Sequence, residues 1–180
     1  NAADAKGLLK AAIRDPNPVL FLEHKALYRQ TKFCARVEPG SDYLIPFGKA
    51  NVVREGQDLT IVGWGMMVVM AMDVASKLAQ EGIDIEVIDL RTIIPCDVPT
   101  IVESVKKTGK LLIAHEAPRT SGFGGEIAAQ VAEAAFEYLD GPIARVCGLD
   151  APVPYSKPIE TAVLPQPSDL ERAIRDLVSY

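Results

Sequence analysis

The sequence predicts an α/β protein with three layers (α/β/α), in which helices cover both faces of a mostly parallel sheet. Two observations support this fold class. From Asp58 onward, apolar runs of strand length alternate with single segments of helix length, which implies right-handed crossovers between parallel strands. In addition, Gly82 and Gly109 follow two predicted helices at the position where glycine commonly ends a helix. The layered domain is expected over roughly residues 45–180.

A separate unit is expected before this domain. The segment Asp4 to Asp15 has the apolar spacing of one helix face, formed by Ala5, Leu8, Leu9, Ala12 and Ile13. The prolines of Asp15-Pro16-Asn17-Pro18 end the helix, and Val19 to Leu22 follows as an apolar run of strand length. One helix and one strand cannot bury both sides of that strand. Residues 1–30 are therefore interpreted as the end of a preceding domain.

Residues 31–48 are interpreted as a linker. Periodicity is weak between residues 25 and 58, and Pro39-Gly40 is typical of a turn. Ala50 to Arg54, before Glu55-Gly56, is a candidate for a short edge strand. The second domain is accordingly assigned to residues 49–180.

The second domain contains alternating strands and helices. Asp97 is expected to cap the middle helix, with Pro99 in its first turn. The predicted strands are 59–62, 83–89, 110–115 and 143–147, and the predicted helices are 66–80, 98–108 and 124–139.

The C-terminal part is predicted to be a coil followed by a helix. Ala151 to Pro167 is rich in proline, and Ser168-Asp169-Leu170-Glu171 has the pattern of a capping box. The apolar face of the last helix would consist of Leu170, Ile174, Leu177 and Val178.

Composition limits the classes of partner. The net charge of −5 and the pI near 5.1 argue against a surface for nucleic acid or anionic membrane. The three cysteines, Cys34, Cys96 and Cys147, are far apart and fit reduced thiols. No apolar run reaches the length of a membrane span. Because the chain begins at Asn1 and enters a helix almost at once, it is expected to be a fragment whose targeting segment, if any, lies upstream.

Two motifs at strand ends are candidates for chemistry. Gly63-Trp64-Gly65 lies at a strand-to-helix turn, with Asp89 one unit downstream, but Val68 stands where a dinucleotide-binding pattern needs its third glycine. A tight turn is favoured over cofactor binding. His115-Glu116 follows a strand and has the chemistry of a general base, yet no nucleophile accompanies it. A local hydrogen-bonding role is favoured for His115, and His24 is interpreted in the same way.

The loop Gly122-Phe123-Gly124-Gly125-Glu126 enters a helix and has the flexibility of a phosphate cradle. The carboxylate of Glu126 in the first turn would repel a phosphate, so a structural role is favoured. These residues alone predict no reaction.

A family resemblance supplies a function. Val87 to Pro95, Lys107 to Ile113 and His115 to Pro118 resemble the transketolase C-terminal-type domain of thiamine-diphosphate-dependent 2-oxo acid dehydrogenase beta subunits. Residues Ala5 to Leu9, Asn17-Pro18 and Phe21 to Glu23 are similar to the end of the pyrimidine-binding domain in that family. The resemblance covers essentially the whole chain in one order.

Finer features favour one branch of that family. Gly122-Phe123 with Glu126-Ile127, and Arg145 to Gly148 with Asp150, resemble the branched-chain 2-oxoisovalerate type more than the pyruvate type. Cys96 is a departure, since many relatives have tryptophan after Ile-Ile-Pro; it affects local packing or subunit contacts.

The resemblance implies an enzyme of two alpha and two beta subunits that binds thiamine diphosphate and magnesium between them. It decarboxylates a 2-oxo acid and passes the acyl group to a lipoyl arm on an acyltransferase core. In this family the catalytic glutamate and histidine of the beta subunit lie upstream of the matching segment, so no catalytic or cofactor-binding residue is carried onto this chain. The compartment that the resemblance implies is the cytoplasm in a bacterium and the mitochondrial matrix in a eukaryote.

Two further sites follow from the resemblance. A potassium ion in relatives lies at the end of the first helix, and the matching residues are Ala12, Asp15 and Asn17, with an ordinary turn as an equal alternative. The C-terminal helix and the carboxylate of Tyr180 are expected to contribute to assembly and to docking of the basic subunit-binding domain of the acyltransferase, or only to cover the sheet.

Alternatives from other classes stay open. One is a pyruvate dehydrogenase beta subunit; another is a transketolase or ketose-phosphate synthase with the same C-terminal domain. A third is a non-enzymatic α/β binding module, which would need a fuller phosphate loop.

Overall fold

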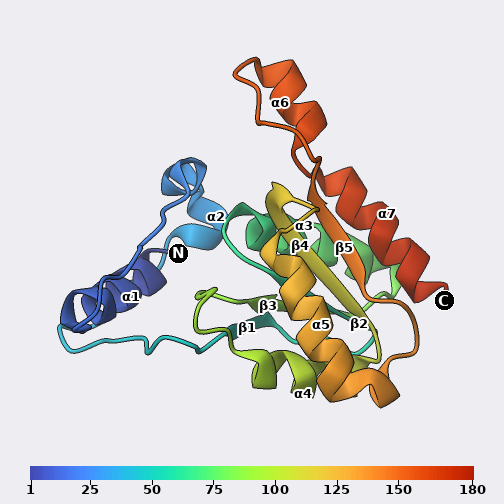
Figure 1. Ribbon diagram of the computed structural model, residues 1–180, viewed down its shortest axis with the longest axis horizontal. Coiled ribbons are helices and arrows are strands. Elements are labelled where there is room, and N and C mark those ends of the chain that lie inside the picture. The colour runs from blue at the N-terminus through green and yellow to red at the C-terminus, as the bar shows by residue number, and fades with distance from the viewer.

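The computed structural model describes residues 1–180 and confirms the three-layer α/β/α fold (Figure 1). One five-stranded sheet has the order β1-β3-β2-β4-β5. Its strands are β1 (Asn51–Arg54), β2 (Leu59–Gly63), β3 (Ile85–Asp89), β4 (Leu111–Pro118) and β5 (Ala144–Gly148).

The sheet is parallel except at one edge. Strands β3, β2, β4 and β5 pair in parallel, whereas β1 runs antiparallel to β3 with an irregular register between Val52 and Arg54. The expected edge strand at residues 50–54 is therefore confirmed. An irregular, short edge strand is a common way to prevent further pairing along a sheet.

Helices cover both faces of the sheet. On one face α3 (Met66–Leu78) and α7 (Pro167–Val178) pack over a cluster of 16 buried apolar residues. On the other face α4 (Val98–Thr108) and α5 (Phe123–Ala135) pack over a cluster of 11. The continuous apolar runs of the central strands are explained by this burial on two sides.

Local signals for helix ends are confirmed in this domain. Asp97 accepts a hydrogen bond from the backbone N–H of Thr100 and begins α4, and Pro99 lies in the first turn. Gly109 ends α4 with φ +70°, and Gly82 has φ +87° after the turn Ala79–Glu81 that extends α3. At positive φ a side chain would clash with the backbone, so glycine is the favoured residue.

The N-terminal segment differs from the sequence prediction. Helix α1 (Ala2–Arg14) is confirmed, but the strand predicted at Val19 to Leu22 is wrong, because this segment has no regular secondary structure and no partner strand. Leu20 and Leu22 are 91% and 84% exposed. A 3₁₀ turn, Lys25–Arg29, lies near the end of residues 1–30, and the predicted linker contains the short helix α2 (Thr31–Cys34). The division into residues 1–30, 31–48 and 49–180 stays a prediction.

The C-terminal part also corrects two expectations. The proline-rich coil contains a short helix, α6 (Lys157–Val163), which stands away from the three layers (Figure 1). We call residues 149–166 the arm. The capping box of α7 is formed by Gln166 and Asp169 instead of Ser168 and Glu171, because Pro167 already occupies the first helical position. Three of the four predicted apolar positions, Leu170, Ile174 and Leu177, are buried.

The three cysteines form no disulfide, in agreement with the prediction of reduced thiols. None of the helices combines the length and the apolar character that a membrane span requires.

Candidate functional site

Polar and aromatic side chains gather where the parallel strands end. The strand β4 carries His115, which is fully buried, and the neighbouring strand β5 carries Cys147. The indole of Trp64, just after β2, stacks on the His115 ring at 5.3 Å, and Phe123 at the start of α5 meets Trp64 edge-on at 6.4 Å. Open α/β sheets usually bind ligands at this carboxyl edge, so we treat it as the candidate site.

The hydrogen bonds of His115 define its tautomer. Its Nδ1 lies 3.0 Å from the carbonyl oxygen of Ala117, and a carbonyl only accepts, so Nδ1 carries the proton. The Nε2 atom lies 3.3 Å from Sγ of Cys147. Burial lowers the pKa of His115 and raises the pKa of the Cys147 thiol. The thiol therefore donates to an uncharged imidazole, and both ring nitrogens of His115 have hydrogen-bond partners within the chain, as the predicted local role requires.

Two glycines allow the His115 ring to lie against the start of α5. A Cβ atom on Gly122 would be 2.6 Å from Cε1 of His115, and one on Gly124 would be 2.6 Å from both Cδ2 and Nε2. The predicted structural role of this loop is explained by the close approach.

The turn at Gly63-Trp64-Gly65 also has a structural explanation. The carbonyl of Gly63 accepts a 2.9 Å hydrogen bond from the backbone N–H of Leu90, and Gly65 has φ +58°. The indole of Trp64 covers the turn through its contact with His115. The predicted tight turn thus agrees with the geometry.

His24 connects the N-terminal segment to the candidate site. Its Nε2 lies 3.0 Å from Oε2 and 3.2 Å from Oε1 of Glu116, and because a carboxylate only accepts, Nε2 is the donor. The two residues are 92 positions apart in sequence. Nδ1 of His24 is buried and has no hydrogen-bond partner. This contact joins residues 1–48 to the second domain.

A second contact across the same boundary was not anticipated from the sequence. Nη2 of Arg91 donates a 2.7 Å hydrogen bond to Oδ1 of Asp4, and the side chains are only 15% and 8% exposed. Arg91 has φ +59°, and its backbone N–H donates to the carboxylate of Asp89 at 3.1 Å. Burial raises the pKa of Asp89. Nothing in the spacing of Asp4 and Arg91 signals this pair; the position of Arg91 just after a strand is the only local indication.

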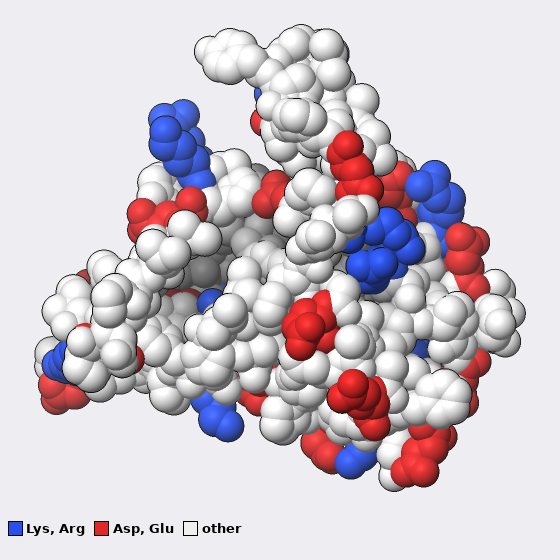
Figure 2. Space-filling model, viewed as in Figure 1, with Lys and Arg blue, Asp and Glu red and all other residues white.

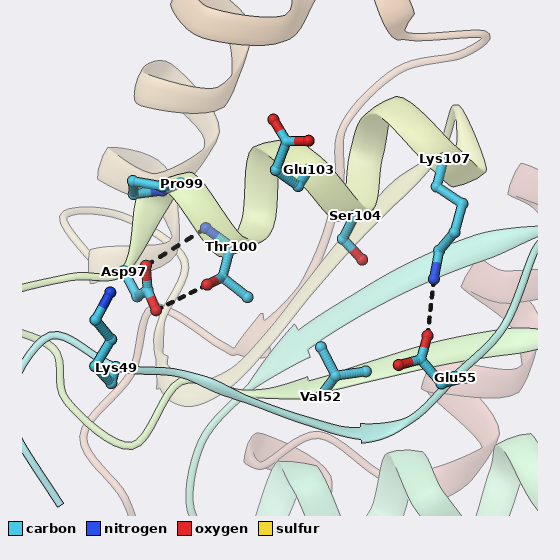
Figure 3. A pocket seen from close by; sticks show the side chains of 9 residues that line it. All are labelled: Lys49, Val52, Glu55, Asp97, Pro99, Thr100, Glu103, Ser104 and Lys107. Carbon is cyan, nitrogen blue, oxygen red and sulfur yellow. Dashed lines mark hydrogen bonds and ion pairs between the residues drawn. The ribbon is translucent and has the colours of Figure 1, made fainter.

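A groove of about 380 Å³ lies between β1 and α4 (Figure 3). Most of its charges are paired within the protein: Lys107 contacts Glu55 at 2.9 Å, and Asp97 accepts from Thr100 and Ala50. Lys49 is the one charged lining residue without such a contact, and a single ammonium does not make a set of polar groups aimed at a ligand. Its nine lining residues are Lys49, Val52, Glu55, Asp97, Pro99, Thr100, Glu103, Ser104 and Lys107.

Beneath the groove, a buried carboxylate is neutralised from α4. Glu86 on β3 is 1% exposed and accepts hydrogen bonds from Ser104 Oγ and Lys107 Nζ. Burial raises the pKa of Glu86, and the Lys107 ammonium opposes this rise. Thr60 Oγ1 extends the network, at 3.0 Å from Ser104 Oγ. The network fixes α4 on the sheet and is structural.

The predicted potassium ligands lie together at the end of α1, but they already contact one another. Oδ1 of Asp15 accepts from the backbone N–H of Asn17 at 2.8 Å and from its Nδ2 at 3.0 Å. The carbonyl of Ala12 accepts from the backbone N–H of Asp15 at 3.3 Å. This geometry describes the ordinary turn and does not test the ion site, which stays a prediction. Across the chain, no three His, Cys, Asp or Glu side chains are grouped to hold a metal.

Tyr180 lies directly after α7, far from the candidate site (Figure 1). Its side chain is 76% exposed and lies against Gly141. The predicted docking role is untested by these contacts.

Comparisons with known proteins define the family. Residues 48–170 match the family model described as "Transketolase, C-terminal domain". The chain is 48% identical over 174 residues to the pyruvate dehydrogenase E1 component subunit beta of Rhizobium meliloti, covering 97% of this chain and 37% of that protein. It is also 48% identical over 177 residues to 2-oxoisovalerate dehydrogenase subunit beta 2 of Arabidopsis thaliana, covering 98% and 48%.

A solved structure agrees with this assignment. A chain described as "Split gene transketolase, inactive beta4 tetramer" superposes with a TM-score of 0.64 and 28% identity, covering 78% of this chain and 44% of that one. The chain spans about half or less of the length of the relatives named here. The matched residues 48–170 contain the whole sheet and every residue of the candidate site except His24 and Asp4. The chain therefore belongs to the transketolase C-terminal domain family.

Proposed function

We propose that this chain is the C-terminal part of the beta subunit of a thiamine-diphosphate-dependent 2-oxo acid dehydrogenase, and that it serves assembly and docking. The observation that supports the proposal is the similarity of nearly the whole chain to beta subunits of two such enzymes, at the same identity of 48%. In the complete enzyme, the reaction would be oxidative decarboxylation of a 2-oxo acid and acyl transfer to a lipoyl group.

The residues of this chain do not fit a thiamine diphosphate site. The carboxylate of Glu126 in the first turn of α5 would repel a diphosphate, and the His115 ring packs against Gly122 and Gly124 at the same helix start. The start of α4 is capped by the carboxylate of Asp97, which would repel a diphosphate. We infer that the cofactor and its magnesium are bound by the alpha subunit and by upstream residues of the beta subunit. His115 and Cys147 then support the edge of the sheet and take no part in the reaction.

For the substrate, we propose branched-chain 2-oxo acids, with pyruvate as the alternative. The motif Arg145 to Gly148 with Asp150 supports the branched-chain class. The similarity to pyruvate dehydrogenase beta subunits supports the alternative equally. The compartment would be the cytoplasm in a bacterium and the mitochondrial matrix in a eukaryote.

For the assembly, we propose a heterotetramer of two alpha and two beta subunits. We further propose that the acyltransferase core docks on the beta subunit near Tyr180 through its subunit-binding domain. Residues 1–30 would complete the pyrimidine-binding domain, and that domain would then cover Leu20 and Leu22, which are exposed and belong to no sheet.

Rates test this function. The complete beta subunit, purified with its alpha subunit, is supplied with thiamine diphosphate and magnesium, and decarboxylation of 3-methyl-2-oxobutanoate is compared with that of pyruvate. A higher kcat/KM for 3-methyl-2-oxobutanoate supports the branched-chain class, and a higher value for pyruvate supports the alternative. If the enzyme decarboxylates neither substrate but transfers ketose groups, the dehydrogenase assignment is wrong.

Calorimetry tests the location of the cofactor. The 180-residue chain by itself is titrated with thiamine diphosphate and magnesium, and we expect no binding. A dissociation constant in the micromolar range, about −8 kcal/mol, would contradict the inference that the cofactor site lies elsewhere.

A further inference from the structure

The arm, residues 149–166, is an apolar projection. No residue of its helix α6 is buried, and Figure 1 shows that this helix stands clear of the sheet and of the covering helices. Tyr155 is fully exposed, and Leu149, Val153 and Ile159 are each 57–58% exposed. A contiguous apolar surface that the fold leaves in solvent commonly marks an interaction site.

The arm has a defined conformation without a partner. The backbone N–H of Leu149 donates to the carbonyl of Val163 at 3.0 Å, which closes the arm at its base. Asp150 accepts from the backbone N–H of Thr120 at 2.9 Å and from its hydroxyl at 2.6 Å, so the base is also held to the end of β4. Nε2 of Gln166 donates to the carbonyls of Thr161 and Leu164. A projection that is ordered in advance loses little conformational entropy on binding.

The charge of the arm limits its partner to an apolar surface. Its only charged side chains are Asp150, Lys157 and Glu160, and Asp150 is already bonded to Thr120. In Figure 2 the arm is largely free of charged side chains, whereas charges are spread over much of the visible face below it. A basic or acidic partner would therefore find little electrostatic complementarity here. The subunit-binding domain that we propose to dock near Tyr180 through basic side chains does not suit this surface.

The position of the arm indicates which apolar partner it meets. Its base adjoins Pro118 and Thr120, at the carboxyl edge where the strands end. The surface is hollowed between the arm and the N-terminal segment (Figure 2). In the heterotetramer proposed above, the alpha and beta subunits share each catalytic site. The alpha subunit must therefore approach residues 1–30, the segment that would complete the pyrimidine-binding domain. The arm faces the same hollow as that segment.

We propose that the arm inserts into an apolar cleft of the alpha subunit, with Tyr155 as the central anchor. This inference rests on the proposed function, because it requires an alpha subunit. Exposed aromatic side chains that become enclosed at the centre of an interface carry a large part of the binding free energy. Val153 and Ile159 would contact the walls of the cleft around Tyr155.

The test measures the affinity between complete subunits. The full beta subunit carrying Tyr155→Ser, and separately Ile159→Ser, is titrated with the alpha subunit, and the dissociation constant is measured by fluorescence anisotropy. We expect Tyr155→Ser to weaken binding about tenfold or more, and Ile159→Ser to weaken it less. The matched control is Phe136→Ser, since Phe136 is 76% exposed but lies at the opposite end of α5 from the carboxyl edge.

Each outcome decides the proposal. Loss of affinity in the arm variants, with the Phe136→Ser variant within twofold of the wild type, supports it. Wild-type affinity in both arm variants overturns it, as does an effect on self-association of the beta subunit alone, which would indicate a second copy as the occupant. If the wild-type beta subunit binds no alpha subunit, the proposed function itself fails. Hydroxyl-radical footprinting of the unmutated subunits gives an independent reading: Tyr155 must become protected when the alpha subunit is added.

Discussion

Arg91 and Asp4 form a nearly buried ion pair at 2.7 Å that fastens helix α1 to the loop after β3. Removing one partner of such a pair leaves the other charge without compensation in a poorly solvated position. The pair therefore holds together two parts of the chain that the sequence assigns to different domains.

The first prediction concerns this pair. We expect Arg91→Ala to lower the free energy of unfolding by about 2–4 kcal/mol, because the Asp4 carboxylate stays buried. The control is Lys32→Ala, which removes an ion pair with Asp73 whose side chains are 68% and 50% exposed, and should cost less than about 1 kcal/mol. Urea unfolding followed by circular dichroism measures both. Equal losses in the two variants would show that burial of the Arg91 pair has no special effect.

The second prediction is a pH dependence. Burial lowers the pKa of His115 in the folded chain, so the unfolded chain takes up a proton at higher pH than the folded one. The stability contribution of the neutral ring is therefore complete at pH 7.5 and is lost as the pH falls below about 6.5. We expect the free energy of unfolding to drop less between pH 7.5 and 5.5 in His115→Gln than in the wild type. Cys147→Ser, which keeps the ring, should retain the wild-type drop; identical drops in all three proteins would exclude His115 as the source.

The third prediction compares adjacent glycines in the first turn of α5. A Cβ on Gly124 meets the buried His115 ring at 2.6 Å, whereas a Cβ on Gly125 meets only Nη1 of Arg145 at 3.2 Å, the end of a flexible side chain. Gly124→Ala should therefore destabilise the chain by about 1–3 kcal/mol through overpacking. Gly125→Ala should be neutral or stabilise it by up to about 1 kcal/mol, since alanine favours the helix. Thermal unfolding distinguishes them, and the reverse order would contradict the packing argument.

The fourth prediction tests potassium at Ala12, Asp15 and Asn17. The last carbonyls of a helix carry partial negative charge, which favours a cation. We expect the complete beta subunit to have a higher melting temperature in potassium than in lithium buffer, and Asp15→Ala to abolish the difference. If the wild type melts at the same temperature in both buffers, these residues form an ordinary turn and no potassium site.

The fifth prediction tests the C-terminus. Tyr180 follows Ser179, the C-cap of α7, and its side chain is 76% exposed. Deleting Ser179 and Tyr180 from the complete subunit should weaken binding to the acyltransferase's subunit-binding domain, more at low than at moderate salt. The unfolding curve of the deleted subunit controls for folding. Unchanged affinity at both salt concentrations would leave α7 with a covering role alone.

Most of the second domain was predictable from local sequence. The strands 59–63 and 85–89 are mostly apolar because both of their faces are buried, and Asp97, Gly82 and Gly109 act through backbone groups a few residues away. Signals of this kind depend on neighbours in sequence, so they are readable without the fold. The predicted capping box of α7, Ser168 with Glu171, lies two residues after the observed one, Gln166 with Asp169. Both pairs have the spacing of a capping box, and Pro167 at the first helical position selects the earlier one.

The strand predicted at Val19 to Leu22 shows where local patterns fail. An apolar run of this length predicts a strand, but a strand also needs a partner with free N–H and C=O groups. No segment of this chain supplies one. The prediction for the arm was wrong for the opposite reason. Its prolines predicted coil, yet Pro158 is well suited to the first turn of the short helix α6.

The sequence by itself determined the succession of strands and helices along residues 51–148, the layered fold class and the family resemblance, because each depends on periodicity, caps and motifs along the chain. Only the tertiary structure decided which residues meet at the carboxyl edge. His24 and Glu116 are 92 positions apart, Arg91 and Asp4 are 87 apart, and Cys147 meets His115 only because β4 and β5 are neighbours in the sheet. Such pairs form when distant elements pack, and their geometry depends on that packing, which no local pattern records.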